Sequence, residues 1–421
     1  MQNDEMLVSL DIGTSEVKII IGEVQSDTVN IIGVGTSKTK GLKKGSIVDI
    51  DETVLSIKEA VQRAEHMVDM KIDNVVLTVN SHQIQLHSCH GVVAVQSENR
   101  EIGNEDVKRV IDGAQVMSIP PEREIIDVIP KQFIVDGQDG ITDPRGMIGV
   151  RLEMEGTVIT CSKTILHNFI KCIEKADLYI SDICLQPIAA GTIALSNDEQ
   201  NLGVALVDIG GGSTTISVFE NHHLVTTTVM PLGGDNITKD ISIGLRTSTE
   251  EAEELKLNYG HAYYDHASEA ETFEVNVIGN QQKVTFNQLE IANIIEARLE
   301  EIYDLIFQEL RRLGFTDLPG GVVLTGGSMK LEGALELAQE LFPFGSRISI
   351  PNYIGVREPQ FTAGVGTILF AYRNAKIQGK DLEPSLVGAT TESVKVKKPR
   401  KQKSEKKEGS KFGNFFKYFF E

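Results

Sequence analysis

The feature that most constrains the fold is a short motif that occurs twice. Residues 8–13 (Val-Ser-Leu-Asp-Ile-Gly) and residues 205–210 (Ala-Leu-Val-Asp-Ile-Gly) both carry Asp-Ile-Gly at the end of an apolar run, and Asp11 and Asp208 lie 197 positions apart. After each aspartate the chain continues with a polar turn, a second strand-like segment and a pair of glycines. A repeat that keeps both the motif and its downstream spacing predicts two homologous domains.

Secondary-structure signals around the two motifs indicate the same unit. Each copy contains three Val- and Ile-rich segments separated by polar turns, followed by a helical pattern, the first with Asp51 as its expected N-cap. The segments are residues 7–12, 17–24 and 29–34, and residues 204–209, 213–219 and 224–230. We therefore predict an α/β fold in which two duplicated α/β domains face each other across a cleft.

Changes in composition predict an insertion and a tail. Short strands alternate with polar and proline-containing stretches in one region, and from Gln378 onward Lys, Pro and Ser replace the apolar residues, which is typical of a linker. The predicted organisation is domain 1 at 1–83, 166–196 and 367–378, an inserted subdomain at 84–165, domain 2 at 197–239 and 315–366, its small subdomain at 240–314, a flexible linker at 379–408 and an amphipathic helix at 409–421.

The net charge of −19 is distributed unevenly along the 421 residues. From Thr391 to the C-terminus there are ten Lys and Arg and four Asp and Glu, a net charge of +6, so residues 1–390 carry −25. An acidic body argues against nucleic-acid binding through bulk charge. No stretch reaches the ~18 apolar residues of a membrane-spanning helix, and the four cysteines form no CxxC pair.

Each Asp-x-Gly turn carries groups that suit a phosphate. Glycine allows backbone N–H groups to approach an anion closely, and the following hydroxyls add donors. Asp11 and Asp208 can share a Mg²⁺ through its water shell, and Lys18 on the returning strand can reach the same phosphates. The predicted phosphate-binding residues are Gly13, Thr14, Ser15 and Lys18 in the first turn and Gly210, Gly211, Gly212 and Thr214 in the second.

These turns resemble the two phosphate loops of the actin/Hsp70/hexokinase superfamily. Residues 325–328 (Thr-Gly-Gly-Ser) resemble its adenosine loop, and residues 186–191 and 363–366 resemble its two connecting helices. The resemblance implies ATP and Mg²⁺ as ligands, with Asp11, Asp208 and Gln186 as catalytic candidates and Gln186 orienting the attacking water. The further nucleotide-binding residues that it implies are Gly234, Glu253, Lys256, Gly326, Gly327 and Ser328.

Within the superfamily, the insertion at residues 84–165 resembles that of the bacterial cell-division family FtsA. The resemblance implies a protein that polymerises on the cytoplasmic face of the cell membrane at the division septum and tethers filaments of the tubulin-like FtsZ. It also implies that the FtsZ C-terminal tail binds residues 240–314 and that other division proteins bind residues 84–165. The exposed candidates for the FtsZ contact are Arg246, Lys256, Asn293 and Glu296.

The C-terminal residues 409–421 carry an apolar stripe. Five phenylalanines recur at helical offsets and occupy an arc of about 140°, which fits a helix lying on an anionic membrane, with the basic linker attracted to the same surface. The alternative is that this helix docks on its own body or in the groove of a partner. The predicted membrane-binding residues are Phe412, Phe415, Phe416, Phe419, Phe420, Lys411 and Lys417.

Two other classes of protein have the same nucleotide-binding loops, and each is an alternative function. One is an actin-like scaffold of a type IV pilus or secretion machine, which would not need the phenylalanine-rich tail or a site for FtsZ. The other is a sugar or acetate kinase, which needs a carboxylate base beside a small substrate pocket. Because no strong general base is evident beyond Asp11, Asp208 and Gln186, we expect ATP hydrolysis to be slow at most.

Overall fold

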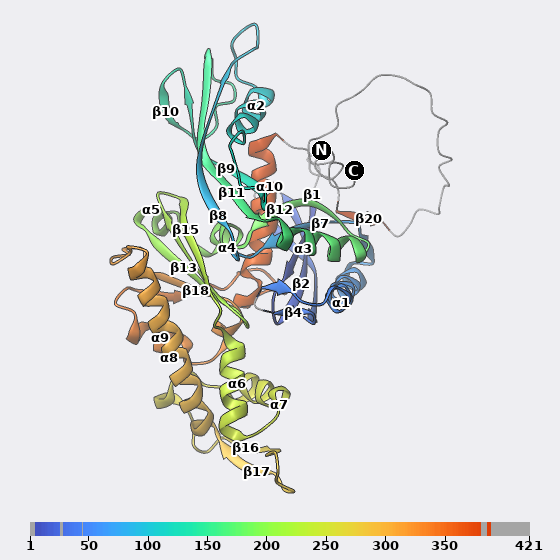
Figure 1. Ribbon diagram of the computed structural model, residues 1–421, viewed down its shortest axis with the longest axis vertical. Coiled ribbons are helices and arrows are strands. Elements are labelled where there is room, and N and C mark those ends of the chain that lie inside the picture. The colour runs from blue at the N-terminus through green and yellow to red at the C-terminus, as the bar shows by residue number, and fades with distance from the viewer. Residues whose placement is uncertain (1–4, 26–27, 44, 380–384, 389–421) are drawn as a thin grey trace, which may run out of the picture. The chain divides into compact units, whose positions relative to one another are not determined.

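The computed structural model describes residues 5–25, 28–43, 45–379 and 385–388 (Figure 1). The chain divides into two compact units, residues 1–387 and 388–421. The second unit lies outside the described residues except for Gly388, so the predicted membrane helix and most of the predicted linker do too. The description below concerns the first unit.

The first domain contains a five-stranded sheet with strand order β12-β7-β1-β2-β3. β1, β2 and β3 form an antiparallel meander, and β7 and β12 extend the sheet with parallel strands. The strands are β1 (Glu5–Ile12), β2 (Glu16–Gln25), β3 (Thr28–Lys38), β7 (Asn74–Val79) and β12 (Tyr179–Leu185). All six residues of β7 are buried, as expected for a central parallel strand covered on both faces.

The second domain repeats this sheet. Its strand order is β15-β14-β13-β18-β19, which equals the order of the first sheet when that sheet is listed from its other edge, β3-β2-β1-β7-β12. Both sheets have an antiparallel meander of three strands followed by two parallel strands. The strands are β13 (Val204–Ile209), β14 (Thr214–Glu220), β15 (His223–Met230), β18 (Val322–Thr325) and β19 (Ser346–Ile348). The duplication predicted from the two Asp-Ile-Gly motifs is therefore present as two sheets of equal topology.

Helices connect the strands in both domains. The first, α1 (Ile50–Val68), begins after Asp49, whose side chain accepts a hydrogen bond from the backbone N–H of Glu52. The prediction that Asp51 is the N-cap was wrong by two residues. Asp51 lies in the first turn instead, where its negative charge interacts favourably with the helix dipole. The helix α3 (Lys163–Lys175) then leads from the inserted subdomain into β12.

Two helices, α4 (Gln186–Ala194) and α10 (Thr362–Gln378), follow the last strand of each sheet and cross each other closely. A methyl group built on Gly366 would lie 1.9 Å from the carbonyl oxygen of Ala189, so only glycine permits this crossing. α10 is continuous from Thr362 and packs against β1, β2 and β7. The predicted boundary between residues 366 and 367 therefore falls inside one helix.

The inserted subdomain is a four-stranded antiparallel sheet, ordered β10-β9-β11-β8, with helix α2 covering one face (Figure 1). Its elements are β8 (Gln85–Ala94), α2 (Asn104–Ala114), β9 (Arg123–Val135), β10 (Gln138–Ile141) and β11 (Arg151–Ser162). Phe133, Leu152 and Met154 form the centre of its own small core. The insertion therefore folds as a separate layer with its own core.

A largely helical region lies between β15 and β18 of the second domain. Its core is formed by apolar side chains at helical spacing, among them Ile295 and Leu299, which pack against Ile237 and Ile241. The elements are α6 (Gly234–Leu245), α7 (Thr249–Tyr259), β16 (Thr272–Val275), β17 (Val284–Asn287) and α8 (Gln288–Arg312). Among the described residues, no helix combines the length and apolarity needed to cross a membrane.

The structure differs from the predicted linker in one segment. Residues Leu386–Gly388 form a short strand, β20, in a two-stranded sheet with β6 (Met70–Ile72). The carbonyl oxygen of Ser385 accepts hydrogen bonds from the backbone N–H groups of Asp73 (3.0 Å) and Asn74 (3.5 Å). The apolar run here is only two residues long, which is too short for a pattern in the sequence to predict a strand.

Candidate nucleotide-binding site

The two Asp-x-Gly turns have the same backbone structure. In the first, the N–H of Gly13 donates to the carbonyl oxygen of Glu16 at 3.0 Å; in the second, the N–H of Gly210 donates to that of Ser213 at 3.0 Å. Each turn joins the first strand of its sheet to the second, so Asp11 and Asp208 occupy matching positions at the strand ends. The duplicated motif therefore encodes a duplicated turn.

The tips of the two turns touch. A methyl group built on Gly211 would lie 1.9 Å from the Ser15 hydroxyl, and one built on Gly212 would lie 2.7 Å from the Thr14 methyl group. Glycine at both positions lets the two backbones approach each other closely. The structure therefore brings together the two sets of phosphate-binding residues predicted from the sequence.

The two aspartates have different electrostatic surroundings. The Lys18 ammonium lies 3.5 Å from Asp11 Oδ2, and both side chains are mostly buried. Asp208 accepts a hydrogen bond from Gln186 Nε2. Desolvation raises the pKa of Asp208 to about 6, and the negative charge of Asp11 adds to this rise, while Lys18 and the Gln186 hydrogen bond oppose it. Asp208 therefore titrates closer to neutral pH than an ordinary aspartate does.

Gln186 leaves one polar atom at the site without a protein partner. Its Oε1 is buried and has no hydrogen-bond partner among the described residues, while its Nε2 is bonded to Asp208. Such an atom fits a bound water or a metal-bound water. Within the described ranges no group of three His, Cys, Asp or Glu side chains could hold a metal. Mg²⁺ held by two carboxylates through its water shell is consistent with this donor set.

The predicted adenosine loop lies directly against the second phosphate turn. Gly326 has a φ of +96°, and a methyl group built on it would lie 2.4 Å from Asp208 Oδ1. The Ser328 hydroxyl donates to the carbonyl oxygen of Gly210 at 3.1 Å and lies 2.7 Å from where a methyl group on Gly234 would be. The second phosphate turn, the glycine pair at Gly234 and the predicted adenosine loop at Ser328 thus meet at the carbonyl oxygen of Gly210.

Lys256 joins this cluster from α7. Its ammonium donates to the Thr238 hydroxyl (2.8 Å) and the Gly234 carbonyl oxygen (3.2 Å), and it forms an ion pair with Glu253 at 2.7 Å. Lys256 is 7% exposed. The prediction that Lys256 is an exposed candidate for FtsZ contact was therefore wrong, because its ammonium is buried against Thr238, Gly234 and Glu253. Arg246 and Asn293 are exposed, whereas Glu296 is half-buried.

Two threonine pairs escaped the sequence analysis. Thr78 lies beside Asp11 in the parallel register of the first sheet, and Thr325 lies beside Asp208 in the second. The Thr78 hydroxyl is 2.8 Å from that of Thr367, and the Thr325 hydroxyl is 2.8 Å from that of Thr362. Both partners lie on α10, so one helix is bonded to the strand beside each aspartate. The two Asp-Ile-Gly motifs do not point to these threonines, because only the strand register shows that Thr78 lies beside Asp11 and Thr325 beside Asp208.

Asp235 is a further residue that the sequence did not point to. It directly follows the glycine pair of the second repeat, and its backbone N–H donates to the carbonyl oxygen of Gly211 at 2.8 Å. Desolvation raises the pKa of its carboxyl, with Lys256 opposing the rise and Glu253 adding to it. Its position directly after Gly233 and Gly234 is the sequence feature that could have marked Asp235 as a site residue.

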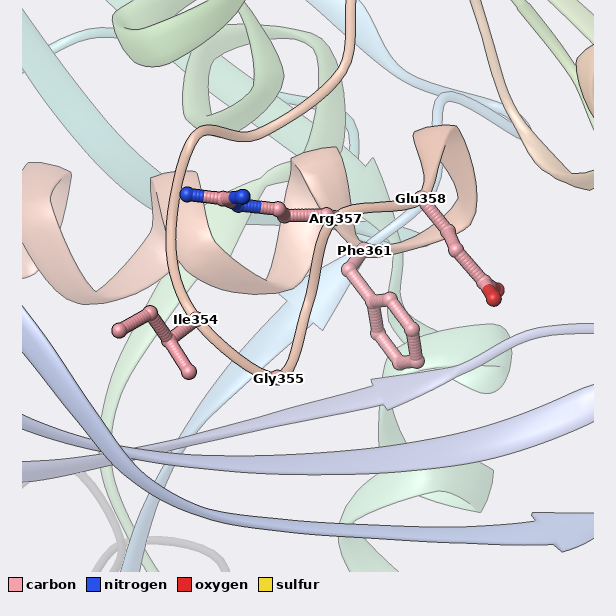
Figure 2. Close-up of a pocket in the computed structure, with 5 residues that line it drawn as sticks. All are labelled: Ile354, Gly355, Arg357, Glu358 and Phe361. Carbon is pink, nitrogen blue, oxygen red and sulfur yellow. The ribbon is translucent and has the colours of Figure 1, made fainter.

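A separate pocket of about 320 Å³ lies beside the segment that leads into α10 (Figure 2). Its lining contains none of the predicted nucleotide-binding residues. Figure 2 shows Arg357 and Glu358 pointing in opposite directions from the loop, and Glu358 forms an ion pair with Lys330 at 2.9 Å. The lining residues are Ile354, Gly355, Arg357, Glu358 and Phe361.

Two sheets of the same topology, each ending in an Asp-x-Gly turn that meets the other, define an actin-like nucleotide-binding fold. Solved structures share this fold. A PilM–PilN type IV pilus biogenesis complex matches with a TM-score of 0.58 and 17% identity, covering 86% of this chain and 97% of that chain. MreB5 of Spiroplasma citri bound to ADP matches with a TM-score of 0.56 and 15% identity, covering 88% of this chain and 98% of that chain. At these identities the likeness concerns the fold alone.

Sequence comparisons define the family. Residues 205–366 match the family model of the cell division protein FtsA, and residues 81–160 match that of the SHS2 domain inserted in FtsA. FtsA of Bacillus subtilis (strain 168) is 62% identical over 382 residues, covering 91% of this chain and 87% of the relative. FtsA of Enterococcus faecalis (strain ATCC 700802 / V583) is 42% identical over 403 residues, covering 94% of this chain and 92% of the relative.

The chain belongs to the FtsA family of actin-like cell-division proteins. This finding confirms the resemblance inferred from the motifs and from the position of the insertion. It leaves the pilus-scaffold and kinase alternatives without support, because the likeness to the pilus complex concerns only the fold.

Proposed function

We propose that this protein binds ATP with Mg²⁺ between its two domains and, in that state, polymerises on the cytoplasmic face of the cell membrane at the division septum. There it tethers FtsZ filaments. The observation that carries the proposal is the contact between the two glycine turns, Gly211 with Ser15 and Gly212 with Thr14, in a chain of the FtsA family. Two sets of backbone N–H donors that meet in this way suit a polyphosphate.

The residues of the cleft divide into two groups by what they offer a nucleotide. On the phosphate side, the two turns provide backbone and hydroxyl donors, and Lys18 provides a positive charge close to Asp11. On the nucleoside side, the ion pair of Glu253 and Lys256 provides an acceptor and a donor next to Gly234. When bound, Mg²⁺ would neutralise phosphate charge, held by Asp11 and Asp208 through water.

Hydrolysis by this site is expected to be slow. A general base works best when its pKa lies near the operating pH, and a pKa of about 6 would suit Asp208. However, Asp208 is already bonded to Gln186 and lies beside Gly326, which leaves it little freedom to accept a proton from water. We therefore assign Gln186 to orienting a water and Asp208 to holding the metal.

The adaptor role involves surfaces away from the cleft. We propose that the FtsZ C-terminal tail binds residues 240–314, where Arg246 and Asn293 offer exposed polar groups. Residues 84–165 would bind other division proteins, since they fold as an independent layer. The predicted helix at residues 409–421, with the five phenylalanines described above, would bind anionic lipid.

Assembly on a lipid monolayer tests this function directly. The full chain is applied with Mg-ATP to monolayers containing anionic lipid, with and without FtsZ, and imaged by electron microscopy. We expect filaments of the chain alone and recruitment of FtsZ when both are present. Absence of both filaments and recruitment would contradict the proposal. A matched chain lacking residues 409–421 should lose lipid binding but keep binding to an FtsZ tail peptide in solution, which separates the two activities.

A further inference from the structure

The short strand β20 holds the start of the C-terminal segment against the first domain. After α10 ends at Gly379, the chain is next described at Ser385, which bonds to the N–H groups of Asp73 and Asn74. Asp73 joins β6 to β7, and Asn74 is the first residue of β7. The described chain is therefore attached to the domain at the end of α10 and again at Ser385, whose own N–H donates to the carbonyl oxygen of Met6 on β1 at 3.4 Å.

The first attachment is extensive. The last two turns of α10 are bonded to the inserted subdomain, where Asn374 donates to Asp127 at 3.1 Å and Arg145 donates to the carbonyl oxygen of Lys376 at 2.9 Å. Gly379 ends the helix with a φ of +62°. Several side chains from separate strands and loops thus hold this end of α10, and it is expected to stay in place.

The second attachment is slight. β6 and β20 have three residues each and make a sheet of two strands, which is marginal without further support. Leu386 is 9% exposed and contributes apolar burial. Against this, the Ser385 hydroxyl is fully buried and has no hydrogen-bond partner among the described residues. Burying a hydroxyl without a partner costs free energy, so the strand is held weakly.

We propose that residues 385–387 are a releasable strap on β6 that sets where the C-terminal segment leaves the folded domain. With the strap in place, the last attachment to the domain among the described residues is β20. With the strap released, that attachment is the end of α10 at Gly379, nine residues earlier, and nine residues span about 30 Å when fully extended. The strap thus controls the reach of the tail. The inference does not depend on what the tail binds.

Hydrogen exchange on the full chain tests whether the strap exists. The backbone N–H of Asp73 donates to the strap, so its exchange rate reports strap opening. Leu386→Asp removes the apolar burial and should speed this exchange about tenfold or more, whereas Ser385→Ala removes the unpartnered hydroxyl and should slow it about fivefold or more. Val394→Asp, further along the chain, is the matched control and should leave the rate unchanged.

The outcomes separate cleanly. Equal rates for Asp73 in the parent chain and in Leu386→Asp would overturn the strap, and a rate that Ser385→Ala does not slow would overturn its weak attachment. Reach is measured by pulsed electron spin resonance between labels at Met67→Cys, 64% exposed on α1, and Ser393→Cys, in a Cys89→Ser background. Adding Leu386→Asp should lengthen and broaden the distance distribution. An unchanged distribution would contradict control of reach.

Discussion

The amide of Gln186 donates a hydrogen bond to the Asp208 carboxylate across the boundary between the two domains. Gln186 begins the helix that leaves the first sheet, and Asp208 is the last but one residue of β13, the first strand of the second sheet. The bond therefore links the two halves of the duplicated fold at the point where the predicted phosphate turns meet. It also favours the charged form of a carboxylate whose pKa is raised to about 6.

The raised pKa of Asp208 makes stability depend on pH. Between about pH 4 and pH 6 the folded protein holds more protons at Asp208 than the unfolded chain does, so the free energy of unfolding falls as the pH rises, by up to about 3 kcal/mol. Asp208→Asn cannot ionise. Without nucleotide or Mg²⁺ at pH 7.5, we expect this variant to be more stable than the parent chain by about 1–3 kcal/mol.

Urea unfolding at pH 7.5 and pH 4 measures this difference. The gain from Asp208→Asn should shrink near pH 4, where the parent carboxyl is protonated in the folded protein and about half protonated in the unfolded chain. Binding of Mg-ATP, followed by calorimetry, should be lost in the same variant because the metal loses a charged partner. A variant less stable than its parent at pH 7.5, or one that keeps tight Mg-ATP binding, would contradict this account of Asp208.

Replacing Gln186 should move the titration of Asp208. Because the hydrogen bond from Gln186 stabilises the charged carboxylate, Gln186→Ala should raise the pKa of Asp208 above about 6, by about one further unit. Mg-ATP affinity requires the ionised form, so the pH midpoint of binding should move upward by the same amount. Gln360→Ala, which removes an amide bonded to Glu358, is the control and should leave the midpoint in place.

Lys256 should be required for nucleotide binding and not for binding of the FtsZ tail. Its buried ammonium bonds Thr238 and the Gly234 carbonyl oxygen, and Lys256→Met would leave both without that partner. We expect ATP affinity to fall about tenfold or more, since hydrogen bonds to charged groups contribute about 1.5–3 kcal/mol. Fluorescence anisotropy with an FtsZ tail peptide provides the comparison. Loss of peptide binding with unchanged ATP affinity would refute this assignment.

The crossing of α4 and α10 should tolerate no side chain larger than hydrogen at Gly366. In Gly366→Ala the new methyl group would meet the Ala189 carbonyl oxygen at 1.9 Å, so the helices must separate, at a cost of about 1–3 kcal/mol or more. Gly113→Ala in α2 is the matched control, because nothing lies within 4 Å of its added methyl group. The control should be stabilised by about 0.5–1 kcal/mol. Thermal unfolding of both variants measures this difference, which should appear as a lower melting temperature for Gly366→Ala and a higher one for Gly113→Ala than for the parent chain.

The sequence by itself determined the duplicated turn and the sheet that carries it. An aspartate at a strand end followed by glycine is a local pattern, because the turn needs glycine for close backbone approach and the strands need apolar residues for burial. The hydrogen bonds of Gly13 and Gly210 match for this reason. Composition also indicated an insertion in the first domain, and in the structure this region has its own apolar core.

Only the tertiary structure decided which polar groups meet. The pairing of Thr78 with Thr367 and the burial of Lys256 depend on strand register and on how helices pack, which no local pattern encodes. The strap at Ser385 depends on an edge strand more than 300 residues earlier in the chain. Local propensity fixes elements that stabilise themselves, whereas contacts between distant segments are selected by the free energy of the whole fold.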